Sequence, residues 1–263
     1  MTEFTALMAG MAKSGDGWTV GVSEDWLQGR TVYGGLAAAL CMQAALNEFG
    51  DVPPLRSAQI AFIGPASGQL LLKPSLLRKG KSTLFASVDL VGEAGLATRA
   101  MFCFGAARKS AFSHVAIGTP DLKAPETCPD FFRSAPPALS FVQHLEGRFV
   151  SGSPPFSGSE DPQMMLWLRL REQGIRPSLV PLLALADAPP PAASARSTAP
   201  SPISTMTWSI DMLTDEIATD DGWWLIHNVA EQIAHGYSSQ AMTLWNRNGQ
   251  PIMASRQNIA VFG

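Results

Sequence analysis

The feature of this chain that most constrains its fold is a run of small and apolar residues between Arg30 and Leu46. It opens on the pair Gly34 and Gly35 and continues through Ala, Leu, Met and Cys, with Gln43 as its polar exception. Because Ala and Leu are strong helix formers and apolar residues occur on every side, the run predicts a helix that is buried all round and too short to span a bilayer. Strand-like sequence follows it, so we expect one central helix wrapped by an antiparallel sheet.

A set of strand-like runs surrounds this helix in the sequence. The helix is predicted over about residues 32–49, since Gly50 and two prolines stand just beyond it. A strand is predicted before it, at 18–23, where apolar and polar residues alternate. Four apolar or alternating runs, divided by glycine-containing turns, come after it and complete a first module by about residue 107. They cover residues 55–67, 68–82, 83–91 and 96–105.

The order of the first module is repeated in the second half of the chain. Strands are predicted over 141–152 and 164–172, a helix over 177–187, and three more strand-like runs, the last of them a hairpin, at the C-terminal end. The ends of the two modules are also alike in sequence, because Leu96–Ala100 resembles Met253–Gln257. This similarity indicates that the final hairpins are duplicates.

The repeat predicts the domain organisation. We expect an N-terminal domain over 1–107 and a C-terminal domain over 139–263, joined by a polar, proline-containing linker over 108–138. A duplication of this size is unlike the repeat of a solenoid, whose period is roughly 20 to 50 residues. The two domains are expected to share one continuous sheet, because joining their edges removes two exposed edge strands.

The composition indicates a globular protein and argues against nucleic-acid binding. Charged residues make up 16% of the chain, against a typical fraction of about 25%, and 46% of residues are hydrophobic, so the chain can bury a large core. The net charge of -3 and the lack of a Lys or Arg run argue against a surface for nucleic acid, which needs clustered cations.

Cysteine usage and the N-terminal segment predict a cytoplasmic location. Cys41, Cys103 and Cys128 cannot all pair and have no metal-ligand spacing, so free thiols in a reducing compartment are expected. No basic region precedes the short apolar run at the N-terminus, as a secretory signal would require. No apolar window is long enough to span a membrane.

Four stretches of the chain carry a resemblance to a known family. They are GRTVYGGLAAAL at the first helix, LLRKGKSTLFASVDLV in the first sheet, LLALADAPPPA in the second half and LWNRNGQPIMASRQNIAVF at the end. In order and spacing they resemble the double-hotdog acyl-CoA thioesterases of the thioesterase II group. The resemblance implies an α+β fold, a tandem double hotdog in which each half is an antiparallel sheet wrapped around a central helix. It also implies hydrolysis of an acyl-CoA substrate in fatty acid metabolism, without a metal or organic cofactor.

The resemblance further implies a set of site residues. In this family a water is held by an Asp at the start of the second helix, a Ser or Thr on the next long strand and a Gln on the final strand. By motif, these fall on Asp187, Thr205 and Gln257. Backbone N–H groups at a helix start can stabilise the oxyanion, and Gly34, Gly35 or the residues after Asp187 are the candidates for this substrate-binding role.

Each of these residues also has a purely structural interpretation. Asp187 precedes a proline triplet and would serve equally as a helix N-cap. Gln257 is more informative, since strand alternation places its amide in a mostly apolar stripe where it must find partners. Thr205 is an ordinary strand residue, predicted to share a face with Thr207 rather than with the apolar residues, and Thr207 or Ser204 could take its place.

Two other functions stay open at this stage. One is a non-catalytic protein that binds acyl-CoA on the same fold, because fold does not fix function. The other is a hotdog hydratase, which is disfavoured because it needs an Asp/His dyad on the central helix. Neither predicted helix carries any of the chain's histidines, which are His114, His144, His227 and His235.

Two further expectations concern shape and assembly. Prolines in PPPAASARSTAPSP occupy the place of a long second helix, and each costs roughly 3 kcal/mol inside a helix, so that helix is expected to be short or irregular. Several tryptophans are predicted to lie on apolar outer faces that pack against another copy, giving a homodimer or larger homo-oligomer. They are Trp208, Trp223, Trp224 and Trp245.

Overall fold

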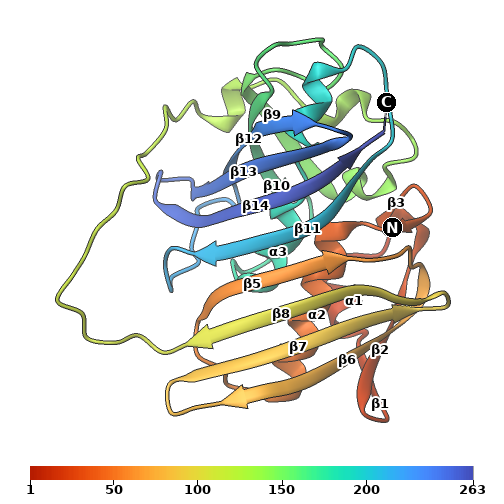
Figure 1. Cartoon of the computed structure of the whole chain (residues 1–263), viewed down its shortest axis with the longest axis vertical. Coiled ribbons are helices and arrows are strands. Elements are labelled where there is room, and N and C mark those ends of the chain that lie inside the picture. The colour runs from red at the N-terminus through yellow and green to blue at the C-terminus, as the bar shows by residue number, and fades with distance from the viewer. Residues whose placement is uncertain (263) are drawn as a thin grey trace.

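The computed structural model describes residues 1–262, without the side chain of Ser134. Its main feature is a twelve-stranded antiparallel sheet that runs from β1 at the bottom of Figure 1 to β9 at the top. From the lower edge to the centre the strands are β1 (Ala12–Ser14), β2 (Gly17–Val22), β6 (Gly68–Lys79), β7 (Thr83–Gly92), β8 (Gly95–Gly105) and β5 (Leu55–Phe62). From the centre to the upper edge they are β11 (Ile203–Met212), β14 (Pro251–Val261), β13 (Tyr237–Asn246), β12 (Trp224–Ala234), β10 (Gln163–Leu170) and β9 (Leu145–Gly152).

The two halves of the sheet meet at its centre. Strand β5 of the first half pairs with β11 of the second, and Ile60 lies opposite Trp208. Outward from this junction, the long strands follow the same sequence order in both halves, β5-β8-β7-β6 and β11-β14-β13-β12. The expectation of a duplicated module with one continuous sheet is therefore confirmed.

The central helix of the first half is α2 (Gly34–Phe49), which the apolar run predicted. It follows the short hairpin of β3 (Leu27–Gln28) and β4 (Thr31–Val32) and ends at Gly50, which has a positive φ of 65°. Its residues from Gly35 to Ala45, apart from Gln43, are buried because it packs on the inner face of the sheet and against a second helix. The apolar residues on every side of α2 are explained by this double coverage.

The second half has a much shorter helical layer. Helix α3 (Leu179–Ala186) packs against α2, and the buried Tyr33 hydroxyl donates a hydrogen bond to the Ala184 carbonyl at 2.8 Å. After the prolines the chain forms only the 3₁₀ helix η5 (Ala192–Arg196), which covers the inner faces of β10, β12 and β13. This confirms the expectation that prolines make the second helix short and irregular.

Short elements at the edges were not expected from the sequence. Helix α1 (Phe4–Ala9) and the 3₁₀ helix η1 (Glu24–Trp26) lie near the N-terminus, and η4 (Ser140–His144) begins the second half. Trp26 is fully buried and stacks on His144 with ring centroids 3.8 Å apart. Two further 3₁₀ turns lie in the predicted linker, η2 (Pro125–Thr127) and η3 (Phe132–Ser134).

The expectation of exposed tryptophans on the outer faces is wrong. All four are at most 5% exposed, two of them in the main core and two in a small second cluster. Ile117, Leu122 and Cys128 of the predicted linker cover this second cluster, and the Trp245 indole donates to the Gly118 carbonyl at 3.0 Å. The linker, which forms the loop at the left of Figure 1, thus helps to bury Trp223 and Trp245, while Trp208 and Trp224 lie in the main core, so the tryptophans provide no argument for a homo-oligomer. The four tryptophans are Trp208, Trp223, Trp224 and Trp245.

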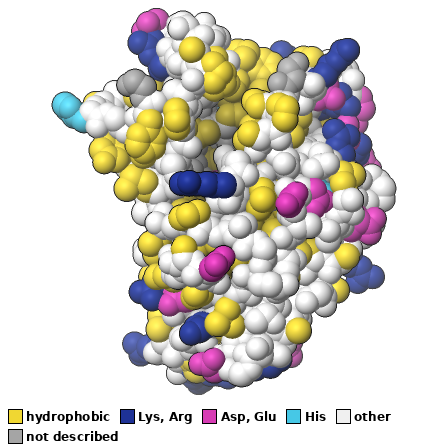
Figure 2. All heavy atoms as spheres, turned by 90° about the vertical axis from the view of Figure 1, so that its right-hand side faces the viewer, with side chains coloured by type: hydrophobic (Ala, Val, Ile, Leu, Met, Phe, Trp, Pro, Cys, Tyr) yellow, Lys and Arg dark blue, Asp and Glu magenta, His cyan; other side chains and the backbone are white. Residues whose placement is uncertain are grey.

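The distribution of charge on the surface and the lengths of the helices agree with what the composition predicts. Figure 2 shows one face of the molecule, on which Lys and Arg side chains are scattered among acidic and hydrophobic ones rather than gathered in one patch. Within residues 1–262, every helix is too short or too polar to cross a membrane.

Candidate active site

Asp187 is the C-cap of α3 and is separated from the proline triplet by Ala188. The interpretation that it starts or caps a following helix is wrong, because the apolar residues before it form the helix and the prolines after it cannot continue it. Its side chain instead reaches the first half of the molecule. Asp187 thus joins the two halves at the level of their helices.

The carboxylate of Asp187 lies against the N-terminus of α2. The backbone N–H of Gly35 donates a hydrogen bond to it. A Cβ atom at Gly34 would lie 2.6 Å from Asp187 Oδ2 and 3.3 Å from the Phe62 ring. The unpaired N–H groups and the positive dipole end of α2 therefore stabilise a negative charge here. The carboxylate approaches this closely because Gly34 has no side chain.

The next residue, Gly35, allows a different close contact. A Cβ atom at this position would lie 2.4 Å from the Tyr33 hydroxyl and 2.6 Å from the Ala184 carbonyl oxygen. Both groups belong to the hydrogen bond that fixes α3 on α2. The glycine pair singled out in the sequence therefore brings two helices and one carboxylate into contact.

The pKa of Asp187 is strongly perturbed. Burial raises it from 3.8 to about 7, while the hydrogen bonds from Gln257 and from the Gly35 N–H act in the opposite direction. The residue as a whole is half-buried. Burial, and to a smaller extent the charge of Asp187, raises the pKa of the Tyr33 hydroxyl well above its ordinary value. Asp187 is therefore poised to exchange a proton near neutral pH.

Gln257 holds Asp187 from the opposite side. It is 4% exposed, and its Nε2 donates to Asp187 Oδ1 at 2.6 Å. Its Oε1 accepts a hydrogen bond of 2.9 Å from Gln240 Nε2, and Gln240 Oε1 accepts one of 2.9 Å from the backbone N–H of Ala192. The expectation that the buried amide of Gln257 finds polar partners is confirmed.

Gln240 was missed by the sequence analysis. It is fully buried on β13, directly opposite Gln257 on β14. The signal was available, because the final hairpin was predicted and its register pairs two glutamines on one face.

Thr205 lies on a different face of β11 from the one expected. A β-bulge between Thr205 and Thr207 shifts the register, so Thr205 is opposite the buried Ile259 whereas Thr207 is exposed. The bulge moves Thr205 onto the inner face, two rows from the row of Gln257. No hydrogen bond joins Thr205 to Asp187 or Gln257. Of the alternatives, Ser204 is exposed as well.

The first half of the molecule offers an internal comparison. Ala100 on β8 lies opposite Val88 on β7 and Ile60 on β5, just as Gln257 lies opposite Gln240 and Trp208. The duplicated hairpins therefore place two apolar side chains where the second half has two buried amides. The polar arrangement around Asp187 is a property of one half, and general packing needs of the fold do not explain it.

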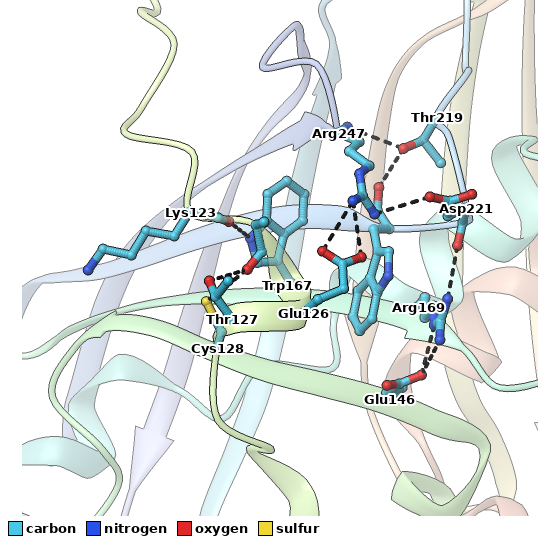
Figure 3. A network of polar contacts seen from close by, with 12 residues as sticks. Lys123, Glu126, Thr127, Cys128, Glu146, Trp167, Arg169, Thr219, Asp221 and Arg247 are labelled. Atoms are coloured by element: carbon cyan, nitrogen blue, oxygen red, sulfur yellow. Dashed lines mark hydrogen bonds and ion pairs between the residues drawn. The ribbon is translucent and has the colours of Figure 1, made fainter.

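The cavity along α3 does not contain these residues. It has a volume of about 400 Å³ and is bordered by Pro181, Leu182, Leu185 and Trp224 on its apolar side. Its polar rim belongs to the ionic network of Figure 3. The cavity and the site at Asp187 are thus separate features.

The charges of that network are paired with one another. Arg247 forms ion pairs with Glu126 at 3.0 Å and Asp221 at 3.2 Å, and Arg169 forms one with Glu146 at 2.7 Å (Figure 3). The pair of Glu126 and Arg247 fastens the end of the predicted linker to the second half of the sheet.

The histidines do not form a second candidate site. His227 Nε2 lies 2.9 Å from Gln163 Oε1, and His144 Nε2 lies 3.0 Å from Asp25 Oδ2. Neither α2 nor α3 contains a histidine. Over residues 1–262, no group of His, Cys, Asp and Glu side chains is arranged to hold a metal ion.

Two family models match the chain. The model described as the acyl-CoA thioesterase C-terminal domain matches residues 125–261, and that of the acyl-CoA thioesterase N-terminal domain matches residues 22–105. Among proteins of curated function, none matches the chain significantly.

Solved structures match over nearly the full chain. A conserved protein of unknown function with a hot dog fold from Alicyclobacillus acidocaldarius has a TM-score of 0.89 at 23% identity, covering 100% of this chain and 99% of its own. A protein from Thermobifida fusca proposed to be a thioesterase II has a TM-score of 0.83 at 19% identity, with coverage of 100% and 98%. An acyl-CoA thioesterase II from Mycobacterium marinum has a TM-score of 0.75 at 15% identity, with coverage of 97% and 96%. The expected fold, a tandem double hotdog, is confirmed.

Proposed function

Because the chain belongs to the acyl-CoA thioesterase family, we propose that it hydrolyses an acyl-CoA thioester to a free acid and coenzyme A with a water activated at Asp187. The family domains support thioesterase activity in general. The observation that carries the mechanism is the carboxylate of Asp187, held between the N-terminus of α2 and the amide of Gln257. That carboxylate is the one group of the predicted site with a pKa near neutrality.

In this mechanism Asp187 acts as a general base. Its carboxylate takes a proton from the water as the water oxygen attacks the thioester carbon, forming a tetrahedral intermediate. When the carbon–sulfur bond breaks, Asp187 can transfer the proton taken from the water to the departing thiolate of coenzyme A. A carboxyl group with a pKa of about 7 suits both steps at neutral pH. No covalent intermediate on the protein is needed.

Gln257 and Thr205 are proposed to position the water. The Gln257 amide has two N–H groups, and one of them is used on Asp187. The second is available to the attacking water. Thr205 lies on the same inner face of the sheet as Gln257, where its hydroxyl can bind that water.

The oxyanion is proposed to form at the start of α2. The first N–H groups of a helix have no partner within the helix and lie at the positive end of its dipole. Gly34 and Gly35 would contribute by bringing this first turn of α2 against Asp187, where the thioester carbonyl is proposed to bind. The Gly35 N–H already binds Asp187, so the oxyanion would use its neighbours in the first turn.

The test is product analysis in isotopically labelled water. The protein is incubated in H₂¹⁸O with short, medium and long acyl-CoAs, and free thiol and the released acid are measured. We expect thiol release together with one ¹⁸O in the carboxylic acid from the first turnover. Acid that carries no ¹⁸O after a single turnover would show attack by a protein carboxylate and contradict the proposed role of water.

A non-catalytic protein is the outcome that would overturn the proposal altogether. It would release no thiol from any acyl-CoA, while the intact thioester still raised the melting temperature. Ligand binding to the folded state alone stabilises a protein by about 2.7 kcal/mol at a hundredfold excess over Kd, so such binding is measurable.

A further inference from the structure

Gln240 connects the proposed base to a backbone group on η5. The Ala192 N–H donates to Gln240 Oε1, Gln240 Nε2 donates to Gln257 Oε1, and Gln257 Nε2 donates to Asp187 Oδ1. The three distances are 2.9, 2.9 and 2.6 Å. Both amides are at most 4% exposed, so bulk water does not compete for these partners.

The two ends of this chain of hydrogen bonds fix its direction. A backbone N–H can only donate, and an ionised carboxylate can only accept. The oxygen of Gln240 must therefore face Ala192, which turns its NH₂ group toward Gln257. The oxygen of Gln257 must then face Gln240, which turns its own NH₂ group toward Asp187. A reversed Gln257 would place an oxygen 2.6 Å from the carboxylate, which is tolerable only if Asp187 is protonated.

The proline triplet contributes to this arrangement. Proline has no backbone N–H, so Ala192 carries the first N–H after Ala188. The Ala188 N–H is already used on the Leu185 carbonyl. The neighbouring buried amide, Asn228, donates to the Pro190 carbonyl at 2.8 Å and holds the same segment without contacting Asp187. The Ala192 N–H is thus the backbone donor that this segment provides to Gln240.

We infer that Gln240 is a positioning residue, which orients the Gln257 amide so that Asp187 always faces a donor and can act as a base. This role rests on the proposed function of Asp187 and extends it. The first half, where Val88 and Ala100 occupy the equivalent positions, has no such chain.

The test compares isosteric variants that remove one amide each. Gln257→Met removes the donor to Asp187, Gln240→Met removes the residue that orients it, and Asn228→Leu removes a similar buried amide as the matched control. The titration of Asp187 is followed by ¹³C NMR of labelled aspartate carboxyls, assigned with Asp187→Asn. Tyr33 is the titratable group coupled to Asp187, and it stays neutral over the pH range used because burial raises its pKa.

We expect Gln257→Met to raise the midpoint of Asp187 by about one pH unit or more, as for loss of a hydrogen bond to a charged group. Gln240→Met should raise it in the same direction and lower kcat at pH 7 roughly tenfold. The double variant should not exceed Gln257→Met alone, because Gln240 acts through Gln257. Asn228→Leu should leave the midpoint in place.

Three results would overturn the inference. They are an unchanged midpoint in Gln240→Met, an equal change in Asn228→Leu, and additive changes in the double variant. If Gln240→Met does not fold, Gln240→Asn, which is too short to span both partners, must give the same rise. If the wild type hydrolyses no acyl-CoA, the proposed function fails, whereas the NMR titration still decides the role of Gln240.

Discussion

The stability of the Asp187→Asn variant, measured relative to the wild type, is expected to increase as the pH rises. Burial raises the pKa of Asp187 from 3.8 to about 7. Between these values the folded protein retains a proton that the unfolded chain has released, so the wild-type free energy of unfolding falls until the pH passes 7. At about 1.36 kcal/mol per pH unit, the interval from pH 5 to 7 corresponds to about 2.7 kcal/mol. Asp187→Asn has no such titration.

The assay is urea unfolding of both proteins at intervals from pH 5 to 8. The stability of Asp187→Asn relative to the wild type should grow by about 2 to 3 kcal/mol over this range, or roughly 5 to 10 °C in melting temperature. Hydrogen bonds lost to asparagine lower its stability by a constant amount, so the change with pH is the diagnostic quantity. Asp16→Asn, in an exposed turn, controls for the loss of an aspartate charge. Parallel curves for Asp187→Asn and the wild type would refute the reasoning.

Three further substitutions test the contacts of the site. Gly34→Ala places a Cβ atom 2.6 Å from Asp187 Oδ2, so kcat should fall at least tenfold while circular dichroism shows a folded protein; an unchanged kcat would mean that the approach is not needed. Tyr33→Phe leaves a buried carbonyl without its donor and should lower stability by about 1 to 3 kcal/mol in urea unfolding; a cost near zero would contradict the helix contact. Thr205→Val should lower kcat about tenfold and the exposed Thr207→Val should not; equal rates in both variants would remove Thr205 from the site.

The scaffold was predictable from the sequence where a local pattern determines the structure. The apolar run from Gly34 to Phe49 can only be a buried helix, and the final hairpin repeats an earlier one, so helix, strands and duplication were all predicted. Gln257 was also recognisable, because an amide within an apolar stripe must find a partner.

The remaining features depend on contacts between distant segments. The side chain of Asp187 reaches a helix of the other half, which no local pattern in the sequence shows. A single-residue bulge placed Thr205 on the inner face, since one extra residue reverses the alternation beyond it. Trp223 and Trp245 were taken for part of an interface because the linker that covers them has no regular pattern of its own.

Release of free thiol from acyl-CoA by the wild type and by Asp187→Ala, measured side by side at pH 7, tests the central claim most directly. The account predicts release by the wild type and a rate about 10² to 10⁴ times lower in the variant, with cooperative unfolding retained in both. An Asp187→Ala protein that cleaves acyl-CoA at the wild-type rate would contradict it.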